Sequence, residues 1–439
     1  MTLIPPIKSL VIDLPPSCIE FCLAAPECFV IGTYFLEKKD DDLVDQSKDK
    51  AVESGEDGVS RSEGGEEEYQ TRTGSLLVYR LVGDEIQIQQ TLPTPYAILD
   101  LHFSPHDPNL LAVAGSTGVL ELFVFAPSNN QLNPYSRHQL FDPSVLVLSL
   151  AWHTTRSDAV GVTASDGGVY TAFVSSASSS SSSEKTGVRS VRQIHCHELE
   201  AWTLAFEQQA DEDETTERSC AVFSGGDDAV LRFTWPVALP LPPSASSQVK
   251  PLETNSDNES DENQEDENPK MQYIDRRIHN AGVTAILPLP GRKQTHITIT
   301  GSYDDHIRVV HTPVVGRKVI LAEENLGGGV WRLKMLEQRI EEGRFIILAS
   351  CMHAGTRIVE ITRPSRTPEG CEQDDEWTIQ VLARFEEHKS MNYGSDVQPL
   401  SSSSASSRAI ENGGRDVRTI VSTSFYDRLV CLWKYPISL

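Results

Sequence analysis

The chain ends in a strand–turn–strand unit, and degenerate copies of this unit recur along its length. The last copy runs from Ser422 to Trp433, with Asp427 in its tight turn. Five upstream segments share its pattern of an apolar strand, a turn of small or acidic residues and a second strand: 114–123, 163–173, 224–235, 301–311 and 350–360. Recurrence of this kind is typical of a β-propeller, in which each repeat forms one blade.

The repeats predict seven blades. An apolar stretch before each copy predicts an inner strand, and a seventh unit is divided between residues 18–34 and 76–79. Six polar segments that interrupt the units are interpreted as insertions: 37–73, 176–190, 208–218, 243–272, 366–376 and 398–415. About 317 residues remain without them, roughly 45 for each unit, which matches the ~40–45 of a four-stranded WD-type blade. We therefore expect a single all-β domain over residues 1–439, a seven-bladed propeller of WD-type repeats.

The last unit lacks a fourth strand before the chain ends. Residues 7–13 are apolar and extended, so we expect the amino terminus to complete that blade and close the ring, which leaves only short sheet edges. Several small domains are the alternative. That arrangement would require each 45-residue sheet to bury its own core, which a sheet with one covered face cannot do.

The net charge of −25 is concentrated in the insertions. The acidic stretches 37–70, 207–217 and 253–268 together carry −22, which leaves about −3 for the rest. Such tracts have too few apolar residues to offset the entropy of ordering, so we expect the insertions to be disordered. The sequence shows no basic patch interleaved with aromatic residues, which argues against nucleic-acid binding.

Other features of the sequence indicate a soluble, cytoplasmic protein, which we expect to be a monomer. The first residues do not resemble a signal peptide, and no apolar run approaches the ~18 residues of a membrane span. The eight cysteines fall mostly within predicted strands without spaced pairs, which predicts reduced thiols rather than disulfides or zinc ligands. The segment His195-Cys196-His197 lacks further spaced ligands, so we predict no metal site there.

One face of the ring is the better candidate for function. If the strands of a blade are lettered a to d from the axis outward, the d–a and b–c connections share a face. Five of the six insertions are predicted in a–b or c–d connections, and only 37–73 interrupts a b–c connection. Binding residues concentrate on short loops held by a rigid frame, so the d–a/b–c face is expected to be the working face.

The last three blades place reactive side chains on that face. His353 occupies the b–c turn where an Asp is expected, and we predict that it is a general base; a solvent-facing turn histidine is the alternative. Tyr426 and the amides of Gly328 and Gly329 are predicted oxyanion donors. His388 and Asp427 complete the predicted catalytic group and shape the pocket. The other candidate substrate-binding residues are Tyr303, Asp304, Trp331, Ser390 and Tyr393.

Histidines and aspartates also have a structural role in this type of repeat. A His before the inner strand is expected to bond the Asp of the b–c turn in the same blade, which predicts the pairs His197–Asp228, His279–Asp305 and His388–Asp427. Cys351 is either a thiol nucleophile or, as its place at a strand end favours, a buried residue. The chain contains no Gly-x-Ser-x-Gly nucleophile elbow. Its glycine run at 327–329 is not a phosphate loop, because no Lys-Ser/Thr pair follows and a strand rather than a helix is predicted next.

At these residues the chain resembles the WD-repeat diphthamide biosynthesis proteins, the diphthine methyltransferase family, which acts as a diphthine methyl ester hydrolase. The matching segments are 327–332, 349–355, 388–394 with Asp396, and 422–427 with Leu432-Trp433.

The resemblance implies an enzyme that hydrolyses the methyl ester of methylated diphthine on elongation factor 2, giving diphthine without a cofactor. The sequence leaves two alternatives open. One is a non-catalytic WD-repeat scaffold, which the fold alone favours, and the other is a module that recognises a modified peptide.

Overall fold

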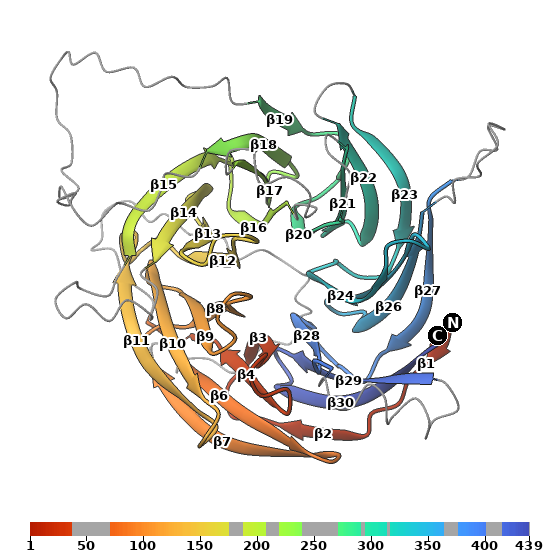
Figure 1. Cartoon of the computed structure of the whole chain (residues 1–439). Helices are drawn as coiled ribbons and strands as arrows, with labels where there is room; N and C mark the ends of the chain where they lie inside the picture. Colours follow the sequence, from red (N-terminus) through yellow and green to blue (C-terminus); the bar gives the residue numbers. More distant parts are fainter. Residues whose placement is uncertain are drawn as a thin grey trace, which may run out of the picture.

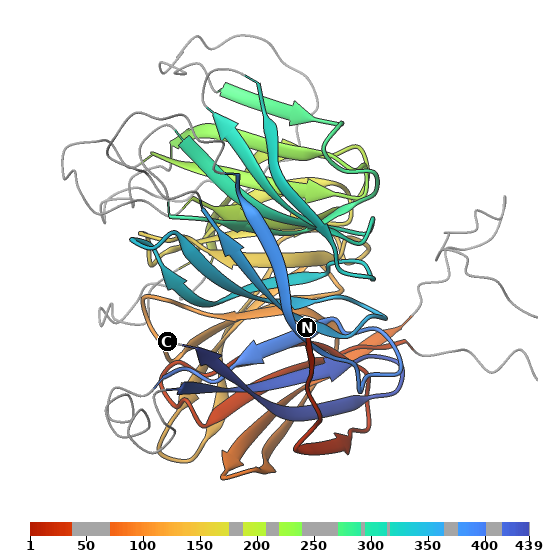
Figure 2. The ribbon, with the colours of Figure 1, turned by 90° about the vertical axis from the view of Figure 1, so that its right-hand side faces the viewer.

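The computed structural model describes residues 1–36, 71–174, 188–207, 219–238, 271–290, 295–313, 317–363, 376–400 and 415–438. Within these ranges every regular element is a β-strand, and seven sheets surround a central axis (Figure 1). The predicted all-β, seven-bladed propeller is confirmed. From the side, the strands run across the thickness of the ring (Figure 2).

The blades follow one another along the chain, and within each blade the strands succeed one another from the axis outward. The first three are β3 (Pro16–Phe21), β4 (Cys28–Thr33), β6 (Arg72–Val82) and β7 (Glu85–Thr94), with the short β5 (Phe35–Leu36) on β6; β8 (Ile98–Phe103), β9 (Leu110–Gly115), β10 (Val119–Ala126) and β11 (Gln131–Gln139); and β12 (Val147–Trp152), β13 (Ala159–Ala164), β14 (Gly168–Val174) and β15 (Val188–Cys196).

The next three blades repeat this order. They are β16 (Ala201–Phe206), β17 (Ser219–Gly226), β18 (Leu231–Ala238) and β19 (Met271–Asp275); β20 (Val283–Pro288), β21 (Thr295–Ser302), β22 (His306–Pro313) and β23 (Val319–Asn325); and β24 (Arg332–Arg339), β25 (Arg344–Ser350), β26 (Thr356–Thr362) and β27 (Thr378–Phe385). The seventh blade contains β28 (Gly394–Val397), β29 (Arg415–Ser424) and β30 (Leu429–Ser438).

The amino terminus closes the ring, as predicted. Strand β2 (Lys8–Val11) pairs antiparallel with β30, with Lys8 opposite Leu432, and supplies the fourth strand of the last blade. The sequence did not predict a second contact, in which β1 (Thr2–Leu3) pairs parallel with β27. The first eleven residues therefore cover the outer edges of two neighbouring blades, which protects those edges from pairing with other chains.

Burial explains why the second strand is a continuous apolar run in several blades. Every residue of β4, β9 and β13 is buried, whereas the outermost strand β7 has only its last residue, Thr94, buried. A strand covered on both faces by neighbouring blades reads as a continuous apolar run, and it is the first strand of the strand–turn–strand unit that located the repeats.

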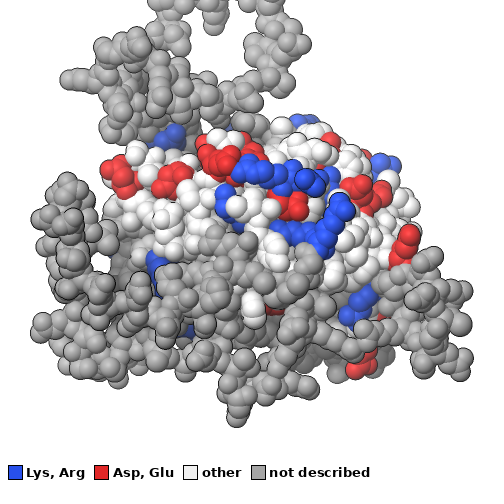
Figure 3. Space-filling model, turned by 90° about the horizontal axis from the view of Figure 1, so that it is seen from above, with Lys and Arg blue, Asp and Glu red and all other residues white. Residues whose placement is uncertain are grey.

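The six predicted insertions fall mostly outside the described residues. The strands on either side of them confirm the predicted connections: 37–70 joins a b strand to a c strand, and the other five join a to b or c to d. At their edges, residues 72–73, 188–190, 271–272 and 415 are strand residues, so the predicted bounds were too wide there. Viewed from above, the described surface carries Lys and Arg side chains interspersed with Asp and Glu (Figure 3). Within the described ranges, the structure contains no helix that could cross a membrane.

Candidate active site

The loops predicted to form the working face lie side by side. We call them the rim: residues 302–305, 326–331, 351–355, 388–393 and 425–427. The backbone amide of Asn392 donates to the carbonyl of Met352 at 3.0 Å, and that of Phe425 donates to the carbonyl of Met391 at 2.9 Å. These bonds join the sixth blade to the seventh, and the amide of Val330 donates to the carbonyl of Ser302 in the fifth blade at 3.0 Å. The expected gathering of loops from blades five to seven is confirmed.

His353 is exposed on the rim, in the turn between β25 and β26. The turn is tightly held, because the amide of Cys351 donates to the carbonyl of Gly355 at 2.8 Å and Met352 adopts a positive φ of 43°. The imidazole makes no hydrogen bond to any described residue, so nothing in the described structure assigns it a scaffold role. The thiol of Cys351 is fully buried, and burial raises its pKa to about 12, which argues against its use as a nucleophile.

The glycine run lies directly against the turn that carries His353. A Cβ at Gly328 would stand 2.5 Å from the carbonyl oxygen of Cys351, and one at Gly329 would stand 2.6 Å from Sδ of Met352. Gly327 has a φ of +84°. Only glycine permits this close approach, so the run positions the His353 turn. Gly328 and Gly329 are both buried, and the use of their amides as oxyanion donors stays a prediction.

His388 belongs to the rim by sequence, but its side chain is buried and does not pair with Asp427 as expected. Its Nε2 lies 2.8 Å from Oγ of Ser422, which also accepts a hydrogen bond from Nε1 of Trp433 at 3.0 Å. Asp427 instead accepts from the amide of Lys389 and the hydroxyl of Ser390, at 3.0 and 2.9 Å. Burial lowers the pKa of His388 to about 4, so this imidazole is neutral and shielded from the rim surface.

Ser390 holds the turn that presents Tyr426. Its Oγ accepts from the amide of Tyr426 at 2.9 Å and lies 2.9 Å from Oγ of Ser424, in addition to its bond with Asp427. The side chain of Tyr426 is 69% exposed. The hydroxyl of Ser390 is therefore engaged within the loop, whereas the phenol of Tyr426 is open to an incoming molecule.

The two other predicted His–Asp pairs have different outcomes. His197 bonds Asp228 as predicted, with Nδ1 and Oδ1 2.9 Å apart. His279 does not bond Asp305; its Nε2 lies 2.9 Å from Oγ1 of Thr300. The turn aspartate of that blade is Asp304, one residue earlier, because Asp305 takes the positive-φ position of the turn.

Asp304, a predicted substrate-binding residue, is engaged by its own blade. Its carboxylate accepts from both terminal nitrogens of Arg308, at 2.9 and 2.8 Å, and from the amide of Asn280 at 2.9 Å. Burial opposes ionisation of Asp304, but these bonds outweigh burial and lower its pKa to about 2. This carboxylate therefore orients two loops and is largely satisfied within the fold.

His195 does not behave as a metal ligand. Its two ring nitrogens contact Thr234 and Ser224, at 2.9 and 2.6 Å. Among the residues that the structure describes, no three His, Cys, Asp or Glu side chains are grouped so as to hold a metal ion, and all seven described cysteines are free.

Three aromatic residues of the rim that were predicted to bind substrate contact a fourth aromatic residue, Trp202, that was not predicted. Trp331 contacts Tyr303 and Tyr393 with ring centroids 5.9 and 5.0 Å apart, and Trp202 contacts Trp331 at 5.6 Å and Tyr303 at 6.3 Å. We call these four residues the aromatic group. Trp202, Trp331 and Tyr393 each stand at the entry to an innermost strand, β16, β24 and β28. An aromatic residue at that repeated position was the signal that could have identified Trp202.

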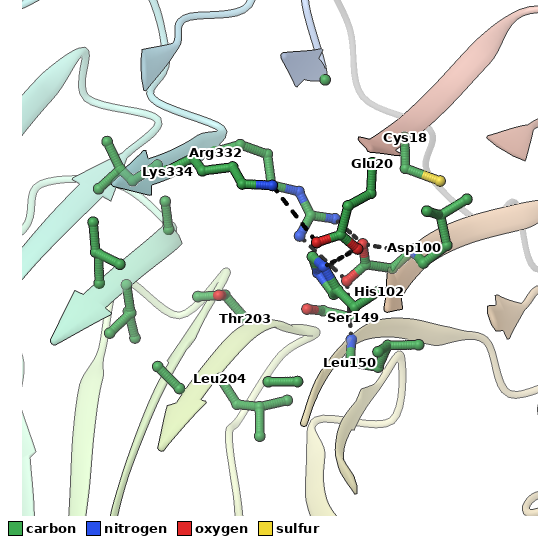
Figure 4. A pocket seen from close by; sticks show the side chains of 18 of the residues that line it. Cys18, Glu20, Asp100, His102, Ser149, Leu150, Thr203, Leu204, Arg332 and Lys334 are labelled. Atoms are coloured by element: carbon green, nitrogen blue, oxygen red, sulfur yellow. Dashed lines mark hydrogen bonds and ion pairs between the residues drawn. The ribbon is translucent and has the colours of Figure 1, made fainter. Parts of the chain in front are cut away.

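Charged side chains inside the central tunnel form a network that the sequence had not predicted (Figure 4). Arg332 on β24 reaches Asp100 on β8, with Nη2 2.8 Å from Oδ1 and Nη1 3.2 Å from Oδ2. Lys334 contacts Asp396 on β28 and lies 3.6 Å from Oε1 of Glu20 on β3. Its signal in the sequence is alternation on two of these innermost strands, with Asp100 and His102 on β8 and Arg332 and Lys334 on β24.

His102 belongs to the same network and stays charged. Its Nδ1 lies 3.2 Å from Oε2 of Glu20, and its Nε2 lies 3.5 Å from Oδ1 of Asp100. Burial alone would lower the pKa of His102, but the two carboxylates outweigh burial and raise it to about 10. An imidazolium of this kind cannot take up a further proton at neutral pH, so His102 is not a general base.

The network borders a cavity of about 270 Å³ along the axis. Its lining comes from the innermost strands, and Tyr393 belongs both to this lining and to the aromatic group. Arg332 follows Trp331 directly in the chain. The rim, the aromatic group and the tunnel therefore form one continuous candidate site, with aromatic rings at the mouth and paired charges below it.

Comparisons with known proteins agree with this fold and with the inferred resemblance. No protein-family model matches the chain. The chain is 28% identical to "Diphthine methyltransferase" of Schizosaccharomyces pombe, over 84% of this chain and 88% of that protein. Proteins of the same name match from Saccharomyces cerevisiae, at 27% over 74% and 84% of the two chains, and from Homo sapiens, at 28% over 66% and 56%. The resemblance is confirmed, and these names favour an enzyme over a scaffold.

A solved structure supports the architecture. A chain in the crystal structure of the mitotic checkpoint complex aligns over 99% of this chain and 93% of its own length, with a TM-score of 0.53. Because the two sequences are only 12% identical, this similarity concerns the fold alone.

Proposed function

We propose that this chain is a carboxylic ester hydrolase of diphthamide biosynthesis, which removes the methyl group from methylated diphthine on elongation factor 2. The similarity to proteins named diphthine methyltransferase, over 84% of this chain and 88% of the first of them, carries the proposal. The products are diphthine and methanol. The substrate is then a side chain displayed on a protein, and an open rim suits such a substrate because a folded partner can approach it. We expect a cytoplasmic monomer.

His353 is the proposed base in this reaction. It removes a proton from water as the water oxygen bonds to the ester carbonyl carbon, and it returns the proton to the departing methoxide, which leaves as methanol. Its exposure, its rigid turn and its lack of any bond to the described residues support this role. His102 and His388, in contrast, are held charged or buried.

The developing oxyanion requires hydrogen-bond donors. The exposed phenol of Tyr426 and the amides of Gly328 and Gly329 are the proposed donors, because the glycines pack on the turn of His353 and Tyr426 belongs to the same rim. His388 and Asp427 act from behind by holding the loop of residues 388–393 in place.

The test is methanol release from elongation factor 2 that carries methylated diphthine. We expect release by the wild type and a loss of at least 100-fold in His353→Ala, in line with the ~10²–10⁴-fold contribution of a general base. His106→Ala is the matched control, because His106 is also exposed but lies in the a–b connection between β8 and β9, on the other face. Unchanged release by His353→Ala would remove this residue from the mechanism.

The same assay separates the alternatives. Binding of the modified factor without methanol release would favour the scaffold or peptide-recognition interpretation. Transfer of a labelled methyl group from S-adenosylmethionine to unmethylated factor, without methanol release, would replace the hydrolase with the transferase that the relatives' names describe.

A further inference from the structure

The charged network exposes its bases to the tunnel cavity more than its carboxylates. The side chains of Arg332, His102 and Lys334 are 27%, 34% and 37% exposed, and all three line the cavity. The three carboxylates that pair with them are more deeply buried, at between 1% and 14% exposed. Because all six residues stand on innermost strands, the surface that the bases leave open borders the tunnel.

The backbone satisfies much of the hydrogen-bonding capacity of the carboxylates. Amides donate to them at 2.7 to 3.0 Å, two to Asp100, two to Asp396 and one to Glu20. Arg332 has five N–H groups, and within the described part of the chain its bonds go to Asp100 alone. Lys334 has three, with one close contact, to Asp396, and Glu20 farther away at 3.6 Å. The network therefore holds N–H groups without acceptors, although its positive and negative charges are equal in number.

Two hydroxyl groups add further donors to the same cavity. Ser149 on β12 and Thr203 on β16 line it, and they are only 3% and 7% exposed. Figure 4 shows both side chains beside the charged network, with their hydroxyl oxygens in the cavity. Neither hydroxyl bonds to any described residue, although buried hydroxyls usually have a partner. An oxyanion in the cavity would accept from these hydroxyls and from the spare N–H groups.

The rest of the cavity wall favours a carboxylate over other oxyanions. On the side of the axis away from β3 and β28, strands β16 and β20 contribute Leu204, Ala205 and Ile286 to the lining (Figure 1). A phosphate carries oxygens on all sides, so those facing this wall would lose water without gaining a donor. A short-chain carboxylate has its two oxygens at one end and an alkyl group at the other, which matches a cavity that is charged on one side and apolar on the other.

We propose that the tunnel cavity binds a short-chain carboxylate, with its oxygens on Arg332 and Lys334 and its alkyl group against Leu204 and Ile286. The hydroxyls of Ser149 and Thr203 complete the donor set. The ligand enters from the rim, where Tyr393 belongs to the cavity lining. This inference goes beyond the proposed function and does not depend on it, because no step of it uses His353 or an ester.

Butyrate is the probe, and butyramide, its neutral isostere, is the matched ligand. Binding to the full chain is measured by saturation transfer from the protein to the alkyl protons of each ligand. We expect butyrate to bind at least tenfold more tightly than butyramide, because charge-assisted hydrogen bonds are the stronger ones. Lys334→Met should weaken butyrate binding at least tenfold. Lys434→Met is the matched control and should leave it unchanged, because Lys434 is equally exposed and ion-paired, with Asp84, but lies on β30 outside the cavity.

Equal binding of butyrate and butyramide would overturn the proposal, since water rather than an anion would then satisfy the donors. Displacement of butyrate by an equal concentration of inorganic phosphate would overturn the choice of a carboxylate. Thr203→Val, which keeps the shape of the side chain and leaves every ion pair in place, should weaken butyrate binding at least threefold. If Lys334→Met does not fold, this variant decides, and unchanged butyrate binding by folded Thr203→Val would refute the site.

Discussion

Removing the guanidinium of Arg332 should destabilise the propeller, because it leaves the buried carboxylate of Asp100 without its main counterion. Asp100 is only 1% exposed, and Arg332 is its strongest partner, at 2.8 and 3.2 Å. Breaking a buried ion pair from one side costs about 3–5 kcal/mol. Two amides at 3.0 Å, those of Leu101 and Leu150, and His102 at 3.5 Å still face the carboxylate. We therefore expect Arg332→Met to lower the free energy of unfolding by about 3 kcal/mol, the lower end of that range.

The assay is urea unfolding followed by tryptophan fluorescence. With a slope of about 3 kcal/mol per molar urea, the loss corresponds to a midpoint lowered by about 1 M. Arg276→Met is the matched control, since Arg276 pairs with Glu198 where both side chains are at least half exposed, and exposed pairs contribute at most about 1 kcal/mol. Asp100→Leu combined with Arg332→Met should be less unstable than the sum of the single variants, by about 2 kcal/mol. Equal shifts for Arg332→Met and Arg276→Met would refute the reasoning.

The remaining predictions concern pH and the glycine run. Because the pKa of His102 is raised from about 6.5 in the unfolded chain to about 10, its stabilising effect is complete below pH ~6.5 and is lost as the pH rises toward 10. The urea concentration at the unfolding midpoint should decrease as the pH is raised from 6.5 to 9.5. An equal decrease in His102→Gln would contradict this assignment. Gly328→Ala should reduce methanol release roughly 10–100-fold by displacing the His353 turn. Gly83→Ala strains its own hairpin turn, where Gly83 has a φ of 63°, but meets no atom within 4 Å and should leave release unchanged. Equal losses of release in both variants would exclude this effect.

The repeat architecture could be predicted from local signals. The strand–turn–strand copies marked the second and third strands of the blades, and an apolar stretch before each copy marked the innermost strand. The strand at Lys8–Val11 was found because the last blade lacked a partner. The working face followed from counting connections, which depends only on the order of strands along the chain.

The identities of the exposed and buried histidines could not be read from the chain. His353 and His388 stand in similar polar loops, yet one is open and the other is buried against Ser422, whose hydroxyl also accepts from Trp433. The turn aspartate of the fifth blade was misplaced by one residue, because the choice between Asp304 and Asp305 depends on which of them takes the positive φ.

By itself the sequence determined the number of blades, their order, the closing strand and the face that gathers the reactive loops, because each follows from local patterns of burial and turn chemistry. Only the closed ring decided the site. Arg332 meets Asp100 across 232 residues of chain, and Trp202 joins Trp331 from another blade. Such contacts exist because the circle brings the innermost strands of all seven blades to one axis, where side chains from distant repeats must neutralise or cover one another.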